Sequence, residues 1–464
     1  MSELASLTIA EASRRLARGA LRAIDLVEAC LARIEQHDAK LNTFTTLTPE
    51  LARAAARQAD RELSAGHRRG ALHGIPVGIK DIYETAGVRT AAHSHLKIDH
   101  VPTVDAETVA RLRAAGAVIL GKLTTHEFAT GAATPDQPFP PARNPWNPEL
   151  QPGGSSSGSG AALAAAFCLG AMGSDTSGSI RNPAGWCAVS GLKPTYGLLS
   201  RRGIFPLAPS FDTAGPMAWT AEDCGLMMDV LAGHDPLDPA SADVAAVSYG
   251  EIAARATVAG LRIGWVRHWY AHADDASEDM VRAIDQAADV MRALGATVEE
   301  VTMPDLLDYQ ACARVIISAE CHALYRKEVD RHPEKFGYTT RRRLQLGAFL
   351  TAEQYVNATR FRRKLQLDTD AAMRGFDLLM TANHYGPLDR FENPPVFHFL
   401  AKPPLPNPFN VTGQPALSVC CGFGRDGSPL AFQFAGRAFD DATVLAAGTA
   451  YERATPWRNT RPAL

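Results

Sequence analysis

Short apolar runs of β type alternate with helical stretches from His73 onward, and this alternation restricts the fold more than any other feature. An apolar run over 75–79 precedes a helical pattern over 109–112, which Gly116 ends, and a second apolar run follows over 117–120. Strand patterns return at 261–266 and 297–301, on either side of a helical pattern over 278–294. Strands that alternate with helices predict a layered α/β sheet.

The two flanks of this core have a different texture. The first 65 residues read as helices, with capping-box spacing from Thr8 to Glu11 and an N-cap signal at Thr48 before Pro49. Residues 310–375 are mainly helical and charged. The proline-rich stretch 387–408 is irregular, and we expect it to line the mouth of a pocket.

Composition excludes several classes of function. Lys and Arg total 47 against 50 for Asp and Glu, so no basic field favours nucleic acid or an anionic membrane. The longest weakly polar stretch, 161–172, is too short to span a bilayer, and the first residues lack a signal peptide. The eight cysteines form no CxxC pair, and we interpret them as reduced core residues. We therefore expect a cytoplasmic protein whose partner is a small molecule.

A Gly/Ser run over 153–160 flows directly into an alanine-rich helix former. A flexible linker would not continue into a helix, so the run is placed at a helix N-terminus, where backbone N–H groups are free. Residues 154–158 also match G-x-S-x-G, the nucleophile elbow of α/β-hydrolases. An elbow needs a strand before its first glycine, but three prolines lie within 145–152, and we reject this interpretation.

A second serine cluster, over 173–184, follows the end of a predicted strand and turns toward Pro183. Consecutive N–H groups in such a turn form a concavity suited to an oxyanion, and a serine within it is a candidate nucleophile. A serine hydroxyl needs a base. Lys80 ends a strongly apolar strand, and burial would lower its pKa toward neutrality by disfavouring the charged form. We expect Asp175 and Arg181 to brace the turn.

Several ordered motifs resemble those of the amidase signature family. They lie at 74–81, 153–159, 173–181, 191–195 and 212–216, with further similarity at 409–417 and 433–437. The resemblance implies an α/β amidase signature fold, with a large, mixed, twisted sheet covered by helices on both faces. It implies a single domain over 1–464: a helical arm at 1–66, a signature core at 67–240, and a variable, mostly helical region at 310–400 that forms the substrate pocket.

The same resemblance implies a Ser-Ser-Lys triad and no metal or cofactor. Ser179 would be the nucleophile, Ser155 the bridging serine held by a cis peptide bond, and Lys80 the base. The oxyanion hole would be formed by the backbone N–H groups of Thr176, Ser177, Gly178 and Ser179. Ser177 departs from the pattern, because many members have glycine there.

Other residues suggest substrate contacts or surface features. We predict that Phe128, Phe139, Gly154 and Trp186 contact the substrate, and many further aromatic residues hint at a hydrophobic or aryl group. His93 and His95 have metal-like spacing, but we expect a surface loop; a zinc site at His126-Glu127 is improbable because the second histidine is missing. Arg341, Arg342 and Arg343 read as a solvated helix face, with recognition of a substrate carboxylate as the alternative.

The resemblance and the residues together predict an amidohydrolase that cleaves amide or carbamate (urethane) C–N bonds through an acyl-serine. The first alternative is the glutaminase component of a tRNA-dependent amidotransferase, and the second is a non-catalytic component of an amidase complex. We rank the glutaminase lower because 402–406 carries no acidic residue to hold the amino group of glutamine. A homodimer is the assembly that we consider.

Overall fold

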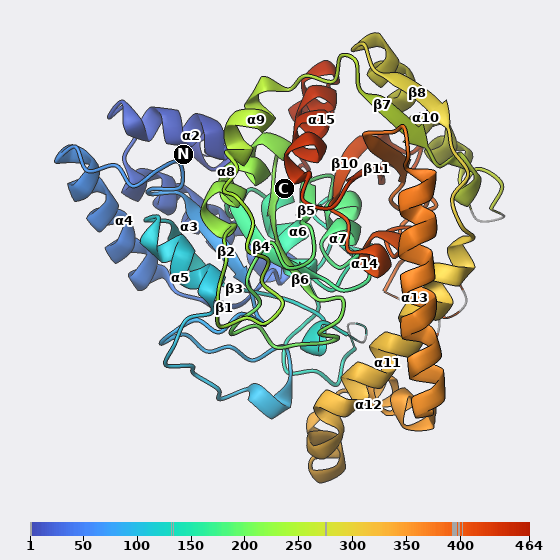
Figure 1. Cartoon of the computed structure of the whole chain (residues 1–464). Helices are drawn as coiled ribbons and strands as arrows, with labels where there is room; N and C mark the ends of the chain where they lie inside the picture. The colour runs from blue at the N-terminus through green and yellow to red at the C-terminus, as the bar shows by residue number, and fades with distance from the viewer. Residues whose placement is uncertain are drawn as a thin grey trace.

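The chain folds around one large sheet (Figure 1). The computed structural model describes residues 2–130, 132, 134–273, 276–391, 397, 400 and 402–464. Within them, eleven strands pair in the order β1-β3-β2-β4-β6-β5-β10-β11-β9-β7-β8. The strands are β1 (Phe44–Leu47), β2 (Pro76–Lys80), β3 (Val118–Leu123), β4 (Gly170–Asp175), β5 (Ser190–Lys193), β6 (Thr213–Ala218), β7 (Arg262–Trp265), β8 (Thr297–Glu300), β9 (Leu378–Ala382), β10 (Ala416–Phe423) and β11 (Pro429–Gly436).

Helices cover this sheet and extend beyond it (Figure 1). They are α1 (Ser2–Ala5), α2 (Ile9–Ala17), α3 (Ala23–Leu41), α4 (Pro49–Ser64), α5 (Glu107–Ala114), α6 (Ser157–Ala164), α7 (Arg181–Trp186), α8 (Ala221–Leu231), α9 (Tyr249–Arg255), α10 (Glu278–Ala293), α11 (Leu306–Arg331), α12 (Tyr338–Gln345), α13 (Ala352–Ala372), α14 (Pro408–Thr412) and α15 (Asp441–Ala454). The long helices α11 and α13 and the shorter α12 stand together at one side of the molecule.

The sheet is mixed, as predicted. Strand β2 runs parallel to β3 and β4, whereas β10 runs antiparallel to β5 and β11. Along β11, Ala431 lies against Gly185 of α7, while the next residue, Phe432, packs on Tyr451 of α15 with ring centroids 4.9 Å apart. Successive side chains of a strand point to opposite faces, so α7 and α15 cover the two faces of the sheet. The prediction of helices on both faces is confirmed.

The N-terminal segment is only partly helical. The capping box from Thr8 to Glu11 is present at the start of α2. The expectation of helices throughout the first 65 residues is wrong for 44–47, because β1 pairs with β3 at the edge of the sheet. Its centre is Thr45-Thr46, and β-branched residues favour a pleated strand. Thr48 makes no capping bond to α4; its hydroxyl donates instead to the carbonyl of Leu120.

The parallel pairing of β2 with β4 decides where the polar residues meet. Ile79 of β2 lies opposite Met172 of β4, so the two strands end at the same edge of the sheet. Lys80 is the last residue of β2 and Asp175 the last residue of β4. In such a sheet the carboxyl ends of adjacent parallel strands form the usual position of a site.

Two further expectations concern the core and the membrane. All eight cysteines are free and buried, which confirms their interpretation as reduced core residues. Among the described helices, none combines the length and apolar character that crossing a bilayer requires.

Candidate active site

Lys80 lies at the centre of a cluster of serine hydroxyls. Its Nζ atom is 2.8 Å from Oγ of Ser155, 2.9 Å from Oγ of Ser156 and 2.8 Å from Oγ of Ser174. Ser155 and Ser156 precede the N-terminus of α6, and Ser174 belongs to β4, so three segments converge on one amine. The peptide bond between Gly154 and Ser155 is cis, as the resemblance implies.

The surroundings of Lys80 favour the neutral amine. Its side chain is fully buried, and burial lowers its pKa to about 7, although Asp175 and Asp212 act in the opposite direction. Desolvation disfavours the ammonium, and uncharged hydroxyls are its hydrogen-bond partners. A lysine in this state accepts a proton at neutral pH, as a general base must.

The turn from Thr176 to Ile180 connects β4 to α7 and carries Ser179. Ser179 is partly exposed, whereas Lys80 and Ser155 are buried. The backbone N–H of Gly178 donates to Oδ1 of Asp175 at 2.7 Å. Among the described residues, the backbone N–H groups of Thr176, Ser177 and Ser179 have no protein acceptor.

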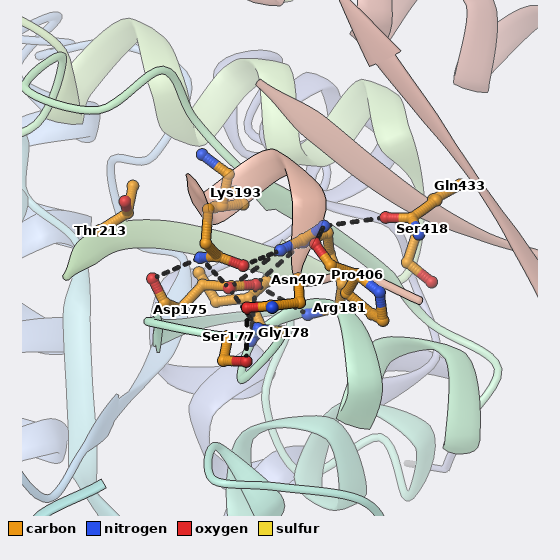
Figure 2. A network of polar contacts seen from close by, with 12 residues as sticks. Asp175, Ser177, Gly178, Arg181, Lys193, Thr213, Pro406, Asn407, Ser418 and Gln433 are labelled. Carbon is orange, nitrogen blue, oxygen red and sulfur yellow. Dashed lines mark hydrogen bonds and ion pairs between the residues drawn. The ribbon is translucent and has the colours of Figure 1, made fainter. Parts of the chain in front are cut away.

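Asp175 and Arg181 brace this turn, in agreement with the prediction. The carboxylate of Asp175 accepts from the guanidinium of Arg181 and from the backbone N–H groups of Gly178 and Ile180. Arg181 also donates to Gln433 of β11 and to the carbonyl of Pro406. Figure 2 shows these groups converging from the turn, from β11 and from the segment that precedes α14. Three distant parts of the chain therefore fix the backbone around Ser179.

The four predicted substrate contacts lie in different environments. Gly154 adjoins Ser155, and a Cβ atom at this glycine would lie 2.2 Å from Cε1 of His126. Phe128 is fully buried, and its ring centroid is 4.7 Å from that of Tyr325 on α11. Phe139 and Trp186 are partly exposed. The ring of Phe139 packs on His93, and the ring of Trp186 packs on His384.

The expectation of a surface loop at 93–95 is wrong for its first two residues. His93 and Ser94 are buried, and only His95 is exposed. His93 Nε2 lies 3.0 Å from the carbonyl oxygen of Phe139, and burial lowers the pKa of His93 to about 4. In the described part of the chain, no three His, Cys, Asp or Glu side chains gather as a metal-binding group.

The arginine triplet on α12 is only partly a solvated face. Arg342 is exposed, as expected, but Arg341 and Arg343 are half-buried. Burial and the nearby Arg314 of α11 lower the pKa of Arg343 to about 9. The expectation is therefore corrected for Arg343, which faces into the junction between α11 and α12.

Sequence reasoning missed several residues of the site. Ser156 and Ser174 contact Lys80, and Asp212 accepts a hydrogen bond from the hydroxyl of Thr176 at 2.6 Å. Asn407 accepts from the hydroxyl of Ser177, and Asn410 donates to Asp175. All except Asn407 lie inside the quoted motifs, so their position was a signal that could have identified them.

Comparisons with known proteins agree with this geometry. A family model described as Amidase matches residues 25–445. The chain is 40% identical to the GatA-type component of glutamyl-tRNA(Gln) amidotransferase from Chloroflexus aggregans, over 100% of this chain and 99% of the relative. It is 37% identical to the same component from Geobacter metallireducens, over 98% of each chain.

Solved structures give the same result. The peptide amidase of Stenotrophomonas maltophilia superposes with a TM-score of 0.86 at 30% identity, covering 98% of both chains. A structure described as a vestigial protein complex, which bears on the origins of an s-triazine catabolic enzyme, has a TM-score of 0.89 at 33% identity, covering 96% of this chain and 98% of that one. The fold and the family match define an enzyme that hydrolyses C–N bonds, and this chain belongs to the amidase family.

Proposed function

We propose that this protein hydrolyses an amide or carbamate through an acyl intermediate on Ser179, with Lys80 as the base and Ser155 as the proton relay. The observation that carries the proposal is a buried, hydroxyl-bound Lys80 beside a turn that exposes Ser179. Family membership supports it, because the peptide amidase that superposes on this chain is also a C–N hydrolase by name.

The proton path follows from the contacts of Lys80. The neutral amine takes the proton of the Ser155 hydroxyl, which lies 2.8 Å away, while Ser155 takes the proton of Ser179. The Ser179 oxygen then attacks the carbonyl carbon, and the C–O bond forms as the carbonyl electrons move to oxygen. On collapse of this intermediate the C–N bond breaks, and the proton returns from Lys80 through Ser155 to the leaving nitrogen.

Stabilisation of the oxyanion is assigned to the turn itself. The N–H groups of Thr176, Ser177 and Ser179 are the donors that remain, since Gly178 N–H is bound to Asp175. Water activated by the same Lys80–Ser155 pair completes the cycle by releasing the acyl group. A carbamate cleaved at its C–N bond leaves an alkoxycarbonyl group on Ser179, which water removes in the same way.

For the substrate we propose a small hydrophobic or aryl amide or carbamate, bound in a pocket to which the helical region 310–400 contributes. A cavity of about 220 Å³ approaches the Lys80 cluster at Ser174, and Ile204, Phe205 and Leu207 contribute apolar walls. The segment 403–407 lies against the turn through Pro406 and Asn407 and carries no charged side chain. A free amino acid brings an ammonium and a carboxylate, which need charged partners when they are buried.

A glutaminase that works within an amidotransferase is the second candidate, and the names of the relatives favour it. Curated relatives at 36–40% identity over 97–100% of this chain are each the GatA-type component of a glutamyl-tRNA(Gln) amidotransferase. Arg201 and Asp212 also line the cavity beside Ser174, and a guanidinium and a carboxylate are the groups that an amino acid substrate would need.

Turnover by the purified chain alone separates the candidates. Glutamine, an aryl acylamide, an aliphatic amide and an aryl carbamate are each incubated with the wild type and with Lys80→Met as the inactive control. Release of aniline or amine without any partner supports the hydrolase. Ammonia from glutamine alone, or only after a partner protein is added, favours the glutaminase instead, and no turnover of any compound contradicts the proposal.

A further inference from the structure

Glu127 is a buried carboxylate at the junction between the serine cluster and the helical region. It begins a short 3₁₀ turn, Glu127–Ala129, and only 1% of its surface is exposed. Among the described residues, no lysine, arginine or histidine pairs with it. Burial raises its pKa to about 7. A buried carboxyl group without a cation must be satisfied by hydrogen bonds, and the identity of its donors is therefore informative.

The donors come from two segments that are distant in sequence. The hydroxyl of Ser94 donates to Oε1 of Glu127 at 2.5 Å, and the backbone N–H of Gly337 donates to Oε2 at 3.0 Å. Ser94 belongs to the loop that follows β2, and Gly337 is the N-cap residue of α12. One carboxylate thus joins the loop after the catalytic lysine to the start of a helix more than 200 residues away.

On its other side, the Glu127 turn adjoins the catalytic serines. The backbone N–H of His126 donates to the carbonyl of Ser155 at 3.1 Å, and the His126 ring lies against Gly154. Ala129, at the end of the turn, lines the cavity that reaches Ser174. A displacement of Glu127 would therefore be transmitted directly to the walls around Ser155 and Ser174.

Apolar packing reinforces the same junction. The Phe128 ring centroid lies 4.7 Å from that of Tyr325 and 5.9 Å from that of Phe336, the residue before Gly337. The backbone of Phe128 has φ 47° and that of Ala129 has φ 60°, a left-handed conformation that residues other than glycine rarely adopt. Such conformations persist only where the surroundings fix them. Here the surroundings are the segment 336–338 and the loop after β2.

We propose that Glu127 is a positioning residue, whose carboxylate docks the segment 336–340 onto the 126–129 turn and thereby sets how a substrate is held beside Ser179. The inference rests on the proposed function for the identity of the nucleophile. Glu127 takes no part in bond breaking. Its effect is on the half-saturating concentration of the reacting molecule, and not on the maximum rate.

The variant Glu127→Gln tests the contact with little change of volume. The glutamine carbonyl can still accept from Ser94, but its NH₂ group then faces the Gly337 N–H, so the docking bond is lost. The probe is an alkyl fluorophosphonate, which phosphonylates Ser179 with release of fluoride. We expect its half-saturating concentration to rise about tenfold and its maximum rate to stay within about twofold.

Hydrogen exchange provides a readout that needs no activity. In Glu127→Gln, the amides of 336–340 should exchange faster than in the wild type, while those of β2 and β4 should not change. The matched control is Asp136→Asn. Asp136 is exposed and accepts from the N–H of Tyr338 on the same segment, and asparagine keeps an acceptor oxygen. Both readouts should stay near the wild-type values in this control.

A second variant breaks the contact from the helix side if Glu127→Gln does not fold. Gly337 has φ −57°, which proline adopts, so Gly337→Pro removes the donor N–H and places a ring against Oε2. It should reproduce both effects of Glu127→Gln. Unchanged exchange at 336–340 in either folded variant, or a lower maximum rate with an unchanged half-saturating concentration, would overturn the proposal. If the probe did not label Ser179 in the wild type, the proposed function would fail, and the exchange result would still decide the docking.

Discussion

The guanidinium of Arg181 holds the carboxylate of Asp175 through two hydrogen bonds, Nε to Oδ2 at 3.0 Å and Nη2 to Oδ1 at 3.1 Å. Both side chains are fully buried. Burial by itself would raise the pKa of Asp175, but the Arg181 charge outweighs it and holds this pKa well below the ordinary value. The pair spans the turn that carries Ser179, and its integrity should therefore matter for both stability and activity.

Replacing Asp175 with Asn should destabilise the fold by about 3–5 kcal/mol, because Arg181 would remain buried without its counter-ion. The free energy of unfolding, measured by urea titration, tests this. Glu149→Gln is the matched control: Glu149 pairs with Arg390 at 2.6 Å, but both side chains are more than half exposed. The control should cost no more than about 1 kcal/mol. Equal losses in the two variants would contradict the assigned role of the buried pair.

Ser179→Ala should reduce turnover by at least ~10⁴-fold and leave the fold intact, because no other group would form the acyl bond. Mass spectrometry after treatment with an alkyl fluorophosphonate should locate the adduct on Ser179 in the wild type only. Ser177→Ala is the control, since Ser177 is a partly exposed serine of the same turn whose hydroxyl donates to Asn407. If Ser179→Ala kept a tenth of the wild-type rate, the nucleophile would be a different residue.

The rate of acylation should rise with pH along one limb centred near pH 7. The pKa of Lys80 is lowered to about 7, so the neutral, proton-accepting amine becomes the main form as the pH passes through this value. The midpoint belongs to the coupled network of Lys80 and its serines. Lys80→Ala should remove the limb, whereas His95→Gln, which changes an exposed histidine, should leave the midpoint in place. A limb that disappeared only in a histidine variant would exclude the lysine base.

Ser174→Ala should move that midpoint to lower pH. The Ser174 oxygen accepts from the Lys80 amine at 2.8 Å and favours the charged form, so removing it makes the ammonium less stable. The control is Ser159→Ala, since the hydroxyl of Ser159 donates to the carbonyl of Met172 and lies in the same buried layer. A midpoint that moved upward in Ser174→Ala would show that Ser174 acts mainly as a donor to the neutral amine.

Lys80→Met should be more stable than the wild type at neutral pH. In the unfolded chain lysine has a pKa near 10.5, and in the folded protein the pKa of Lys80 is about 7. Between these values the unfolded state binds one more proton, so wild-type stability rises with pH across this window. The advantage of the variant should therefore be largest below pH 7 and smallest above pH 10.5. Thermal unfolding at several pH values measures it.

Lys122→Met provides the contrast, because Lys122 is equally buried but lies 3.7 Å from the Asp81 carboxylate. Removing it should destabilise the protein by leaving that carboxylate without its cation. If both lysine variants changed stability in the same direction, the cost assigned to the unpaired Lys80 would be wrong.

Local patterns were sufficient for most of the secondary structure. The apolar runs at 75–79 and 117–120 became β2 and β3, and the capping box at Thr8 starts α2, because each depends on residues close together in the chain. The strand 44–47 was missed because its pairing partner, β3, lies more than 70 residues away. An edge strand of four residues has too little periodicity to be recognised without that partner.

The sequence by itself determined the chemical inventory: two serine-rich turns, a lysine at the end of an apolar strand, and an alanine-rich helix that places the first turn at its N-terminus. Only the tertiary structure decided which of these groups meet. The parallel pairing of β2 with β4 brings Lys80 to Ser174, and the buried Arg181 draws Gln433 and Pro406 to the turn of Ser179. Long-range pairing and burial set these distances and the pKa of Lys80, and neither is encoded in any short segment of the chain.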